Sequence, residues 1–319
     1  MATPTPIGGI HHVTAIATDP QRNLDFYAEV LGLRLVKKTV NFDDPGTYHL
    51  YYGDEAGRPG TILTFFPWPL AVRGSRGVGQ VTVTAFSVPE GSLGFWKERL
   101  AGAGITVEET GERLEEEVLT LLDLDGLKLE LVAHAGAAER PAWEGGGVPA
   151  EHAIRGVYAV TLSEQGYETT AALLSEVMGF ALVAESGNRY RFDVGQGGAG
   201  ARLDILCTPD APHGRIAAGS VHHVAFRVAD DEAQEGWRVR LAGAGRNVTP
   251  VLDRQYFKSI YFREPGGVLF ELATDPPGFT HDEPLESLGS ALKLPPWLEP
   301  HRQRIEDTLP PLEMGGGRA

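Results

Sequence analysis

The stretch GIHHVTAIATDPQRNLDFYAEVLGL, residues 9–33, decides the fold of this chain. Residues 9–18 form an apolar run that is typical of a strand, and residues 24–33 carry apolar side chains at helical spacing. Asp19 and Pro20 stand where the start of a helix is normally capped. Three more strand-like runs follow, at residues 33–40, 48–52 and 61–66. The sequence therefore predicts a unit of one strand, one helix and three strands, written βαβββ.

The same order of elements recurs three more times along the chain. First strands are expected at residues 81–88, 157–162 and 221–228, and the helices that follow them at residues 93–103, 169–178 and 232–242. The sequence LAGAG occurs at residues 100–104 and again at residues 241–245. Two helix C-caps would also produce this match, because glycine suits the left-handed backbone there. Repetition of the whole unit explains more, and we expect an α+β fold of four βαβββ modules.

The four modules are expected at residues 8–67, 78–134, 155–208 and 219–275, paired into two half-barrel domains. Residues 135–154 are rich in Gly, Ala and Pro, which is typical of a linker. Residues 276–319 are rich in proline. We expect this C-terminal tail to cover the surface without adding a core.

The composition restricts the class of partner. The 319 residues are 42% hydrophobic and 22% charged, as in ordinary globular proteins. A net charge of −15 would repel a nucleic-acid backbone or an anionic membrane surface, so we expect neither as a partner. The single cysteine, Cys207, can form neither an internal disulfide nor a thiolate metal cluster. No export signal and no apolar run of about 20 residues is visible, so we expect a cytoplasmic protein.

Two His-His pairs lie in equivalent places, on the first strands of the first and fourth modules. These pairs are His11-His12 and His222-His223. Adjacent residues of a strand point to opposite faces, so each pair can offer one imidazole to a barrel interior. Alignment of the apolar residues that follow matches His12 with His223.

Glu271 completes a candidate set of metal ligands. It lies between Phe270 and Leu272 on the last strand of the fourth module, where a carboxylate is costly to bury without a cation or donors. Two imidazoles and one carboxylate are the ligands of the non-haem iron(II) oxygenases, and they leave positions free for substrate and oxygen. Satisfied core histidines and an exposed glutamate are the alternative, but they do not explain the repeat-equivalent placement.

The other modules lack this set. Val83 and Ala159, at the positions that match the histidines, cannot bind a metal. Glu130 matches Glu271 but has no histidine partner, so we expect it to face outward from the sheet. In the first module the matching position is Phe65, which leaves the metal three protein ligands and an apolar wall. One centre with ligands from the first and fourth modules requires these two modules to pack together.

At these residues the sequence resembles the vicinal oxygen chelate superfamily (glyoxalase, bleomycin resistance protein and extradiol dioxygenase), whose βαβββ modules pair into half-barrels around a metal. It most resembles the hydroquinone-type ring-cleaving dioxygenases, through GIHHVT at residues 9–14, SVHHVAF at residues 220–226 and RQYFKSIYFREPGGVLFELATD at residues 254–275. The resemblance implies iron(II), with manganese(II) as the alternative, bound by His12, His223 and Glu271. It also implies supporting catalytic roles for His11, Thr14, His222, Arg254 and Tyr261.

The residues give these roles unequal support. Thr14 shares a strand face with His12, so that its hydroxyl can orient a ligand. The planar fork of Arg254 suits a phenolate or a carboxylate. His11 and His222 should face away from the centre, so their roles require a bulge.

Tyr261 is predicted to donate to a substrate oxygen if the hairpin register places it on the face of Glu271. With Phe262 opposite Val268, Tyr261 would oppose Leu269 and share that face.

Several residues that invite a functional interpretation are expected to have none. Five histidines without a repeat partner are expected on the surface or in loops, and they are His49, His134, His152, His213 and His301. The run GQGGAG at residues 195–200 lacks the strand-to-helix context of a dinucleotide loop and predicts a hairpin turn. Cys207 is expected to be a buried thiol and not a nucleophile.

These observations favour an iron(II)-dependent enzyme that cleaves the ring of a small hydroquinone-type or catechol-type diol with dioxygen. One alternative is a glyoxalase-type isomerase or thiol transferase with zinc, nickel or manganese, against which the missing fourth carboxylate argues. The other is a non-catalytic, bleomycin-resistance-like binding protein that needs no metal. Homo-oligomerisation is compatible with each of these readings.

Overall fold

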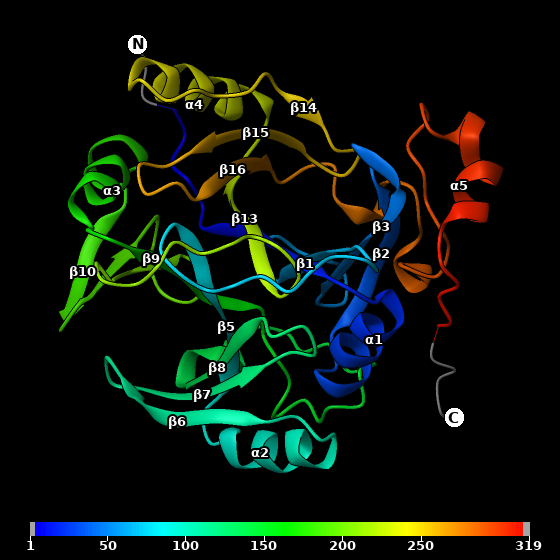
Figure 1. The fold of residues 1–319 in the computed structure, drawn as a ribbon, viewed down its shortest axis with the longest axis horizontal. Coiled ribbons are helices and arrows are strands. Elements are labelled where there is room, and N and C mark those ends of the chain that lie inside the picture. Colours follow the sequence, from blue (N-terminus) through cyan, green and yellow to red (C-terminus); the bar gives the residue numbers. More distant parts are fainter. Residues whose placement is uncertain (1–3, 315–319) are drawn as a thin grey trace.

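The β-strands of the computed structural model, which describes residues 4–314, form two eight-stranded sheets (Figure 1). The first sheet has the order β14-β15-β16-β13-β1-β4-β3-β2, and the second has the order β10-β11-β12-β9-β5-β8-β7-β6. Antiparallel pairing of β1 with β13 joins modules 1 and 4, and pairing of β5 with β9 joins modules 2 and 3. The predicted α+β fold and the predicted pairing of the first module with the fourth are both confirmed.

Each sheet contains two βαβββ modules. Module 1 contains β1 (Ile10–Ala17), α1 (Pro20–Leu24), the π-helical turn η1 (Asp25–Val30), β2 (Arg34–Asn41), β3 (Asp44–Gly53) and β4 (Ile62–Pro67). Module 4 contains β13 (Ser220–Val228), α4 (Asp231–Gly243), β14 (Leu252–Asp253), β15 (Lys258–Arg263) and β16 (Leu269–Thr274). Module 2 contains β5 (Gln80–Pro89), α2 (Leu93–Gly102), β6 (Val107–Arg113), β7 (Glu116–Leu122) and β8 (Lys128–His134). Module 3 contains β9 (Val157–Glu164), α3 (Glu168–Ala172), the π-helical turn η3 (Leu173–Met178), β10 (Ala181–Ser186), β11 (Arg189–Asp193) and β12 (Arg202–Cys207).

The helices begin where the sequence supplies caps. The Asp19 side chain accepts a hydrogen bond from the Arg22 backbone N–H, and Pro20 follows at the first helical position. This helix therefore starts at Pro20, as the cap predicted at Asp19 and Pro20 requires. At α4 the Asp230 side chain accepts from the Ala233 N–H in the same way.

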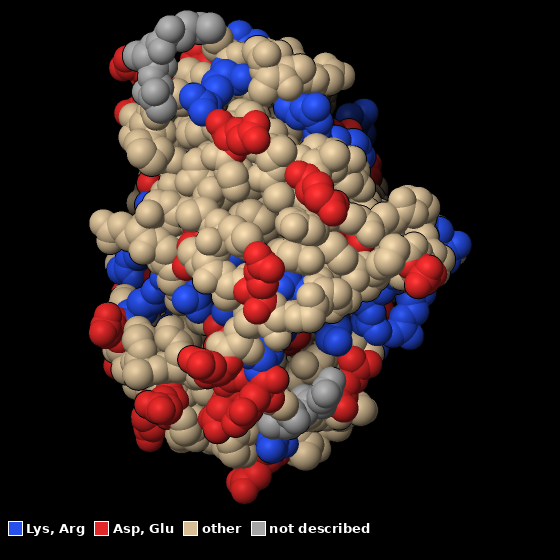
Figure 2. Space-filling view, turned by 90° about the vertical axis from the view of Figure 1, so that its left-hand side faces the viewer, with Lys and Arg blue, Asp and Glu red and all other residues tan. Residues whose placement is uncertain are grey.

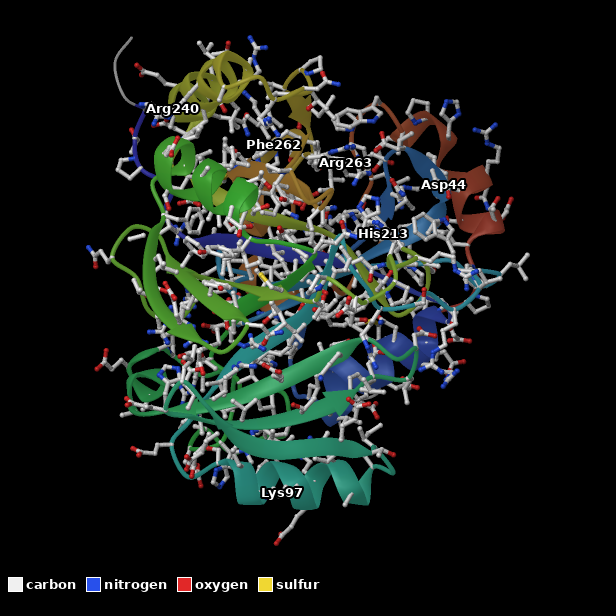
Figure 3. The ribbon with its side chains drawn as sticks, turned by 60° about the vertical axis from the view of Figure 1, so that its left-hand side comes forward. Asp44, Lys97, His213, Arg240, Phe262 and Arg263 are labelled. Atoms are coloured by element: carbon white, nitrogen blue, oxygen red, sulfur yellow. The ribbon has the colours of Figure 1, made fainter. Side chains whose placement is uncertain are left out.

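The repeated LAGAG segments are preceded by arginines that make equivalent contacts. Arg99 Nε on α2 donates to the Val30 carbonyl at 2.7 Å, and Arg240 Nε on α4 donates to the Val177 carbonyl at 2.7 Å. Figure 3 shows Arg240 between α4 and the helix of module 3. Both contacts join a helix to the C-terminal end of the helix in the preceding module. Because unrelated C-caps would not share this contact, the internal repeat extends to the packing between modules.

The C-terminal tail adds buried side chains, contrary to the expectation that it only covers the surface. It contains η4 (Phe279–His281), η5 (Leu285–Ser287), η6 (Glu299–His301) and α5 (Arg302–Thr308). Phe279 and Leu288 are buried against module 1 residues such as Val36 and Tyr51. Lys37 of β2 is fully buried, and its Nζ lies 2.6 Å from the Asp282 carboxylate and 2.5 Å from the Glu283 carboxylate. A buried ammonium group requires carboxylate partners of this kind, and the two ion pairs therefore hold the tail against the first sheet.

Charged side chains are interspersed on the face seen in Figure 2, and acidic ones gather in its lower part. This distribution agrees with the net charge of −15. Within residues 4–314, no helix is both long and apolar enough to cross a membrane.

Candidate metal centre

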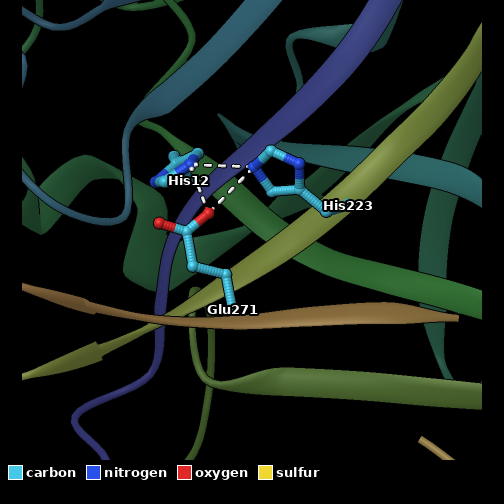
Figure 4. Close-up of side chains that lie close together, drawn as sticks. All are labelled: His12, His223 and Glu271. Atoms are coloured by element: carbon cyan, nitrogen blue, oxygen red, sulfur yellow. Dashed lines mark hydrogen bonds and ion pairs between the residues drawn. The ribbon is translucent and has the colours of Figure 1, made fainter. Parts of the chain in front are cut away.

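His12 on β1, His223 on β13 and Glu271 on β16 meet inside the first half-barrel (Figure 4). Nε2 of His12 lies 3.3 Å from Nε2 of His223. Oε2 of Glu271 lies 2.9 Å from the His223 Nε2 and 3.4 Å from the His12 Nε2. All three side chains are buried. Within residues 4–314 they form a cluster whose ligand atoms lie close enough together to hold one metal ion, and no second cluster of three or more His, Cys, Asp or Glu side chains does so. The fold thus brings together ligands that are far apart in the sequence.

The electrostatics of this cluster suit a divalent cation. Oε1 of Glu271 accepts a hydrogen bond from Ser259 Oγ at 2.5 Å, but Oε2 is buried and accepts none from the described residues. Burial by itself would raise the pKa of Glu271, but the facing imidazoles outweigh it and hold this pKa well below its ordinary value. Burial lowers the pKa of His223. One carboxylate and two imidazole Nε2 atoms therefore meet at one point, and once these nitrogens give up their protons the donor set fits a metal ion.

β-Bulges place the neighbouring histidines beside the ligands. The pairing of β1 with β13 shifts register at His11 and again at His222, so that neither has a direct cross-strand partner. His11 Nδ1 lies 2.9 Å from His12 Nδ1, and His222 Nδ1 lies 2.8 Å from His223 Nδ1. The structure therefore contains the bulges that a role for these two residues requires.

These contacts determine which ring nitrogens carry protons when a metal is bound. A ligand that uses Nε2 carries its proton on Nδ1. The Nδ1–H of His223 must then donate to Nδ1 of His222, which leaves the His222 proton on Nε2. Burial lowers the pKa of His222 to about 3, so that its ring is neutral. His222 lines the cavity beside the ligands and can offer this N–H to a bound molecule.

A cavity of about 300 Å³ opens onto the ligands. Its aromatic walls are Phe42, Tyr51, Phe66, Trp68, Phe257 and Tyr261. Such a mostly apolar hollow with a few polar groups is suited to a small aromatic ligand.

Arg254 and Tyr261 lie together at this cavity. Tyr261 on β15 lies directly opposite Glu271 on β16, so their side chains share a face. Phe262 lies opposite Phe270 and not Val268, and this two-residue difference from the predicted register preserves the face. The Arg254 guanidinium carbon lies 5.5 Å from the centre of the Tyr261 ring.

The charges around Arg254 and Tyr261 leave the arginine as a cation and the tyrosine as a neutral hydrogen-bond donor. Arg254 Nη1 lies 3.0 Å from the Asp43 carboxylate. Burial and the charge of Glu271 raise the pKa of Tyr261, so its hydroxyl stays protonated and can donate.

Thr64, and not Phe65, is the module 1 counterpart of Glu271. Thr64 pairs with Thr14, two residues after His12, just as Glu271 pairs with Ala225, two residues after His223. Phe65 is buried with its ring 4.5 Å from that of Tyr27, in the core. The predicted alignment fails because one more residue separates Pro265-Gly266 from β16 than separates Pro59-Gly60 from β4. The predicted aromatic wall at Phe65 is wrong, but the conclusion that no fourth carboxylate is present holds.

His49 is a site residue that sequence reasoning missed. It was expected on the surface or in a loop, but it lies on β3 and lines the cavity. Its Nε2 lies 2.7 Å from Thr64 Oγ1, and its Nδ1 lies 2.8 Å from the Tyr51 hydroxyl. The alternation of His49 and Tyr51 on one strand face is the signal that could have found it.

The other histidines without a repeat partner lie outside the site. His213 and His301 are exposed, as expected. His134 and His152 are half-buried, and they contact Ser87 and Phe95 respectively. The run at residues 195–200 forms the turn between β11 and β12, and half-buried Cys207 has its thiol pKa raised by burial.

The second half-barrel has arginine–carboxylate ion pairs at the positions where the first half-barrel has the candidate metal ligands. Glu130 pairs with Ala85 as Glu271 does with Ala225. Glu130 is 4% exposed and lies 2.7 Å from Arg113 Nη1, so the expected outward orientation is wrong. The arginine that neutralises it lies on another strand, which the strand pattern of Glu130 alone does not reveal.

Asp204 stands at the counterpart of Thr64 and is paired at 2.8 Å with both Arg189 and Arg191. Arginines therefore compensate the buried carboxylates that a metal would otherwise neutralise.

The chain is similar to proteins of a known family. A family model described as "Glyoxalase/Bleomycin resistance protein/Dioxygenase superfamily" matches residues 9–131 and 159–272. The "Putative ring-cleaving dioxygenase MhqO" of Bacillus subtilis (strain 168) is 49% identical over 96% of this chain and 97% of that protein. The "Chlorohydroquinone/hydroquinone 1,2-dioxygenase" of Sphingobium indicum is 36% identical over 97% of this chain and 98% of that protein. A crystal structure of a "putative dioxygenase from Bacillus subtilis subsp. subtilis str. 168" is 48% identical, with a TM-score of 0.91, over 97% of this chain and 98% of that chain.

Proposed function

The chain belongs to the glyoxalase/bleomycin resistance protein/dioxygenase superfamily, and on this premise we propose that it is an iron(II)-dependent, extradiol-type dioxygenase that cleaves the ring of hydroquinone-type diols. The observation that carries the proposal is the buried set of two imidazoles and one carboxylate at the end of an aromatic cavity. Such a set leaves coordination positions free for a substrate oxygen and for dioxygen. The names of two relatives, one a ring-cleaving dioxygenase and the other a hydroquinone 1,2-dioxygenase, support it.

His12, His223 and Glu271 would hold the iron, which would bind both substrates side by side and let electrons pass from the diol to dioxygen. The carbon–carbon bond beside a hydroxyl-bearing ring carbon breaks, and both atoms of dioxygen enter the product. The reaction therefore balances without an external reductant. A metal other than iron(II), such as manganese(II), would fit the same ligands.

Around the metal, the chain's own groups bind and orient the diol. The aromatic walls exclude water from the ring, and the Arg254 guanidinium favours an ionised phenolic oxygen. The protonated Tyr261 hydroxyl donates to an oxygen that gains negative charge. His222 holds a second oxygen through its Nε2–H. These fixed donors need no reorganisation as charge develops.

Two other functions make different predictions. A glyoxalase-type isomerase or thiol transferase would use a metal without consuming dioxygen, and the hydroxyl of Thr64 in place of a fourth carboxylate argues against it. A sequestering protein would bind its ligand without metal, and the buried Oε2 of Glu271, which accepts no hydrogen bond from the described residues and faces two imidazoles, argues against that function.

Oxygen uptake tests the proposal directly. The protein is reconstituted anaerobically with iron(II) or manganese(II), and uptake is then measured with a panel of substituted hydroquinones and catechols. We expect one mole of dioxygen to be consumed per mole of hydroquinone, with a ring-opened product. A metal-loaded protein that consumes no dioxygen with any diol would exclude the dioxygenase.

A further inference from the structure

We propose that Tyr51, His49, Thr64 and Thr14 form a one-directional hydrogen-bond relay whose last proton, on the Thr14 hydroxyl, is offered to a ligand oxygen at the metal centre. His49 is then a positioning residue that acts through Thr64 and Thr14. The direction of the relay follows from the structure alone, and only the identity of the receiving ligand rests on the proposed dioxygenase function.

The relay crosses three adjacent strands of the first sheet. The Tyr51 hydroxyl lies 2.8 Å from His49 Nδ1, and His49 Nε2 lies 2.7 Å from Thr64 Oγ1. Thr64 Oγ1 donates to Thr14 Oγ1 at 3.0 Å. Tyr51 pairs with Thr64 across β3 and β4, and Thr64 pairs with Thr14 across β4 and β1. The sheet register therefore holds the four side chains in line.

A count of protons fixes the direction. A hydroxyl has one proton, and that of Thr64 is given to Thr14. Thr64 must therefore accept from His49, which places the imidazole proton on Nε2. A neutral imidazole carries one N–H, so Nδ1 has no proton and accepts a hydrogen bond from the Tyr51 hydroxyl. Burial lowers the pKa of His49 and raises that of Tyr51, in agreement with a neutral ring and a protonated phenol.

Thr14 is left with an unused proton. Its hydroxyl accepts from Thr64, is fully buried, and donates to none of residues 4–314. Thr14 lies two residues after His12 and is the cross-strand partner of His223. A buried donor with no protein acceptor, placed between two metal ligands, indicates an acceptor that arrives with the bound ligand. An oxygen of the diol or of dioxygen is such an acceptor.

The relay gives the Thr14 donor a fixed orientation before the reaction begins. A lone threonine hydroxyl rotates, and it must reorganise to follow a developing oxyanion. The Thr14 oxygen already accepts a hydrogen bond from Thr64, so the Thr14 proton must point away from Thr64. Preorganised donors of this kind contribute to rate through the transition state and less through substrate binding.

The first experiment measures the proton on His49 in the metal-free protein. ¹⁵N-histidine labelling and long-range ¹H–¹⁵N correlation distinguish the two tautomers of a neutral ring. We expect His49 to carry its proton on Nε2, and we expect Thr64→Val to remove this preference. A proton on Nδ1 of His49 in the parent protein overturns the relay whether or not the protein is a dioxygenase.

The second experiment uses turnover of the iron-loaded protein. Thr14→Val and Thr64→Val should each lower kcat about 10- to 100-fold, in the range of residues that support a metal site, with an unchanged dissociation constant for iron(II). The double variant should be no slower than Thr14→Val, because the members of one relay act as a unit. Multiplied effects in the double variant would show independent roles and overturn the proposal.

Substitution of His49 separates a relay from mere packing. In His49→Gln the amide oxygen can accept from Tyr51 while the amide N–H donates to Thr64, so we expect most of the rate to be kept. His49→Phe fills the space without donating and should lose as much as Thr64→Val. Equal rates in these two variants would overturn the role of His49.

The chain offers a matched control for the threonines. Thr161 is the counterpart of Thr14 in the second half-barrel, where it pairs with Asp204 as Thr14 pairs with Thr64. Thr161→Val makes the same change outside the site and should leave kcat at the parent value. If no diol is turned over by the parent protein, the proposed function fails, and the tautomer measurement still tests the relay.

Discussion

Thr64 occupies in module 1 the position that Glu271 occupies in module 4. Thr64 lies opposite Thr14 on β4, and Glu271 lies opposite Ala225 on β16. The two-fold arrangement of the half-barrel therefore brings two imidazoles and one carboxylate to the centre, with a hydroxyl where a second carboxylate would complete four ligands. Three ligands leave room for two exogenous ones. The residue at position 64 thus decides how many coordination positions stay open.

The first prediction follows from this relationship. Thr64→Glu adds a fourth ligand and a second negative charge, so zinc(II) and manganese(II) should bind more tightly than in the parent. Dioxygen-dependent turnover should fall at least about 100-fold, because the new carboxylate takes a position that a substrate needs. Metal titration and oxygen uptake measure the two effects. Undiminished oxygen uptake in this variant would mean that position 64 does not face the metal.

The second prediction concerns the buried charge. Glu271→Gln keeps the shape of the side chain but removes the charge that balances the cation, so iron(II) affinity and turnover should each fall by about 10- to 100-fold or more. Iron content after desalting and oxygen uptake are the measurements. Full activity with a normal iron content would remove Glu271 from the ligand set.

Glu130→Gln is the matched control, because Glu130 is the counterpart of Glu271 in the second half-barrel. Turnover per folded molecule should equal that of the parent. The melting temperature should fall, because Arg113 loses its carboxylate partner.

The third prediction concerns Tyr261. Tyr261→Phe keeps the ring against His223, with the two ring centres 5.7 Å apart in the parent, but removes the hydroxyl donor. Iron should stay bound, and kcat should fall by about 100-fold with a smaller change in KM, because the donor acts on charge that develops during the reaction. Steady-state kinetics with oxygen detection measure the split. An unchanged kcat would exclude Tyr261 from the mechanism.

The clustering of His12, His223 and Glu271 and the pairing of modules 1 and 4 could be predicted from the sequence because both follow from local periodicity. Strand alternation and the repeat register were enough to align His12 with His223, and a shared metal then required modules 1 and 4 to pair. The exposure and partners of Glu130 could not be predicted, because the Arg113 that neutralises it lies on a different strand. One extra residue between the Pro-Gly pair and the strand was enough to move the predicted counterpart of Glu271 from Thr64 to Phe65.

The other two differences between prediction and structure, at His49 and in the C-terminal tail, also arise from polar contacts between segments that are distant in the sequence. His49 has no repeat partner in the sequence, and its role depends on hydrogen bonds to Tyr51 two residues along β3 and to Thr64 on the neighbouring strand. The burial of the tail depends on Lys37, whose need for two carboxylates becomes visible only when β2 is placed. Polar contacts between distant segments carry little periodic signal.

The fourth prediction concerns a pair of buried carboxyl groups at the junction of modules 3 and 4. Thr170 Oγ1 lies 2.8 Å from Glu164 Oε2 and 2.6 Å from Glu264 Oε2. The threonine has one proton for these two contacts, so one carboxyl group must itself donate. Glu264 accepts backbone N–H donors from Gly266 and Val268 at 2.7 Å, whereas Oε1 of Glu164 is buried without a hydrogen-bond partner among the described residues. Glu164 is therefore the protonated partner, and burial followed by the charge of Glu264 raises its pKa to about 8.

A pKa raised on folding makes the folded state bind a proton that the unfolded chain releases near the ordinary glutamate pKa of 4.5. This contribution to stability is fully present below pH 4.5, declines as the pH rises, and is gone above about pH 8; its total is on the order of 5 kcal/mol. Glu164→Gln keeps a donor to Thr170 but does not titrate, so the fall in melting temperature between pH 5 and pH 8 should become shallower. Glu168→Gln, at an exposed position on the helix α3 that carries Thr170, is the control and should keep the slope of the parent. An equal slope in Glu164→Gln and the parent, measured by thermal unfolding at several pH values, would show that Glu164 is ionised in the folded protein.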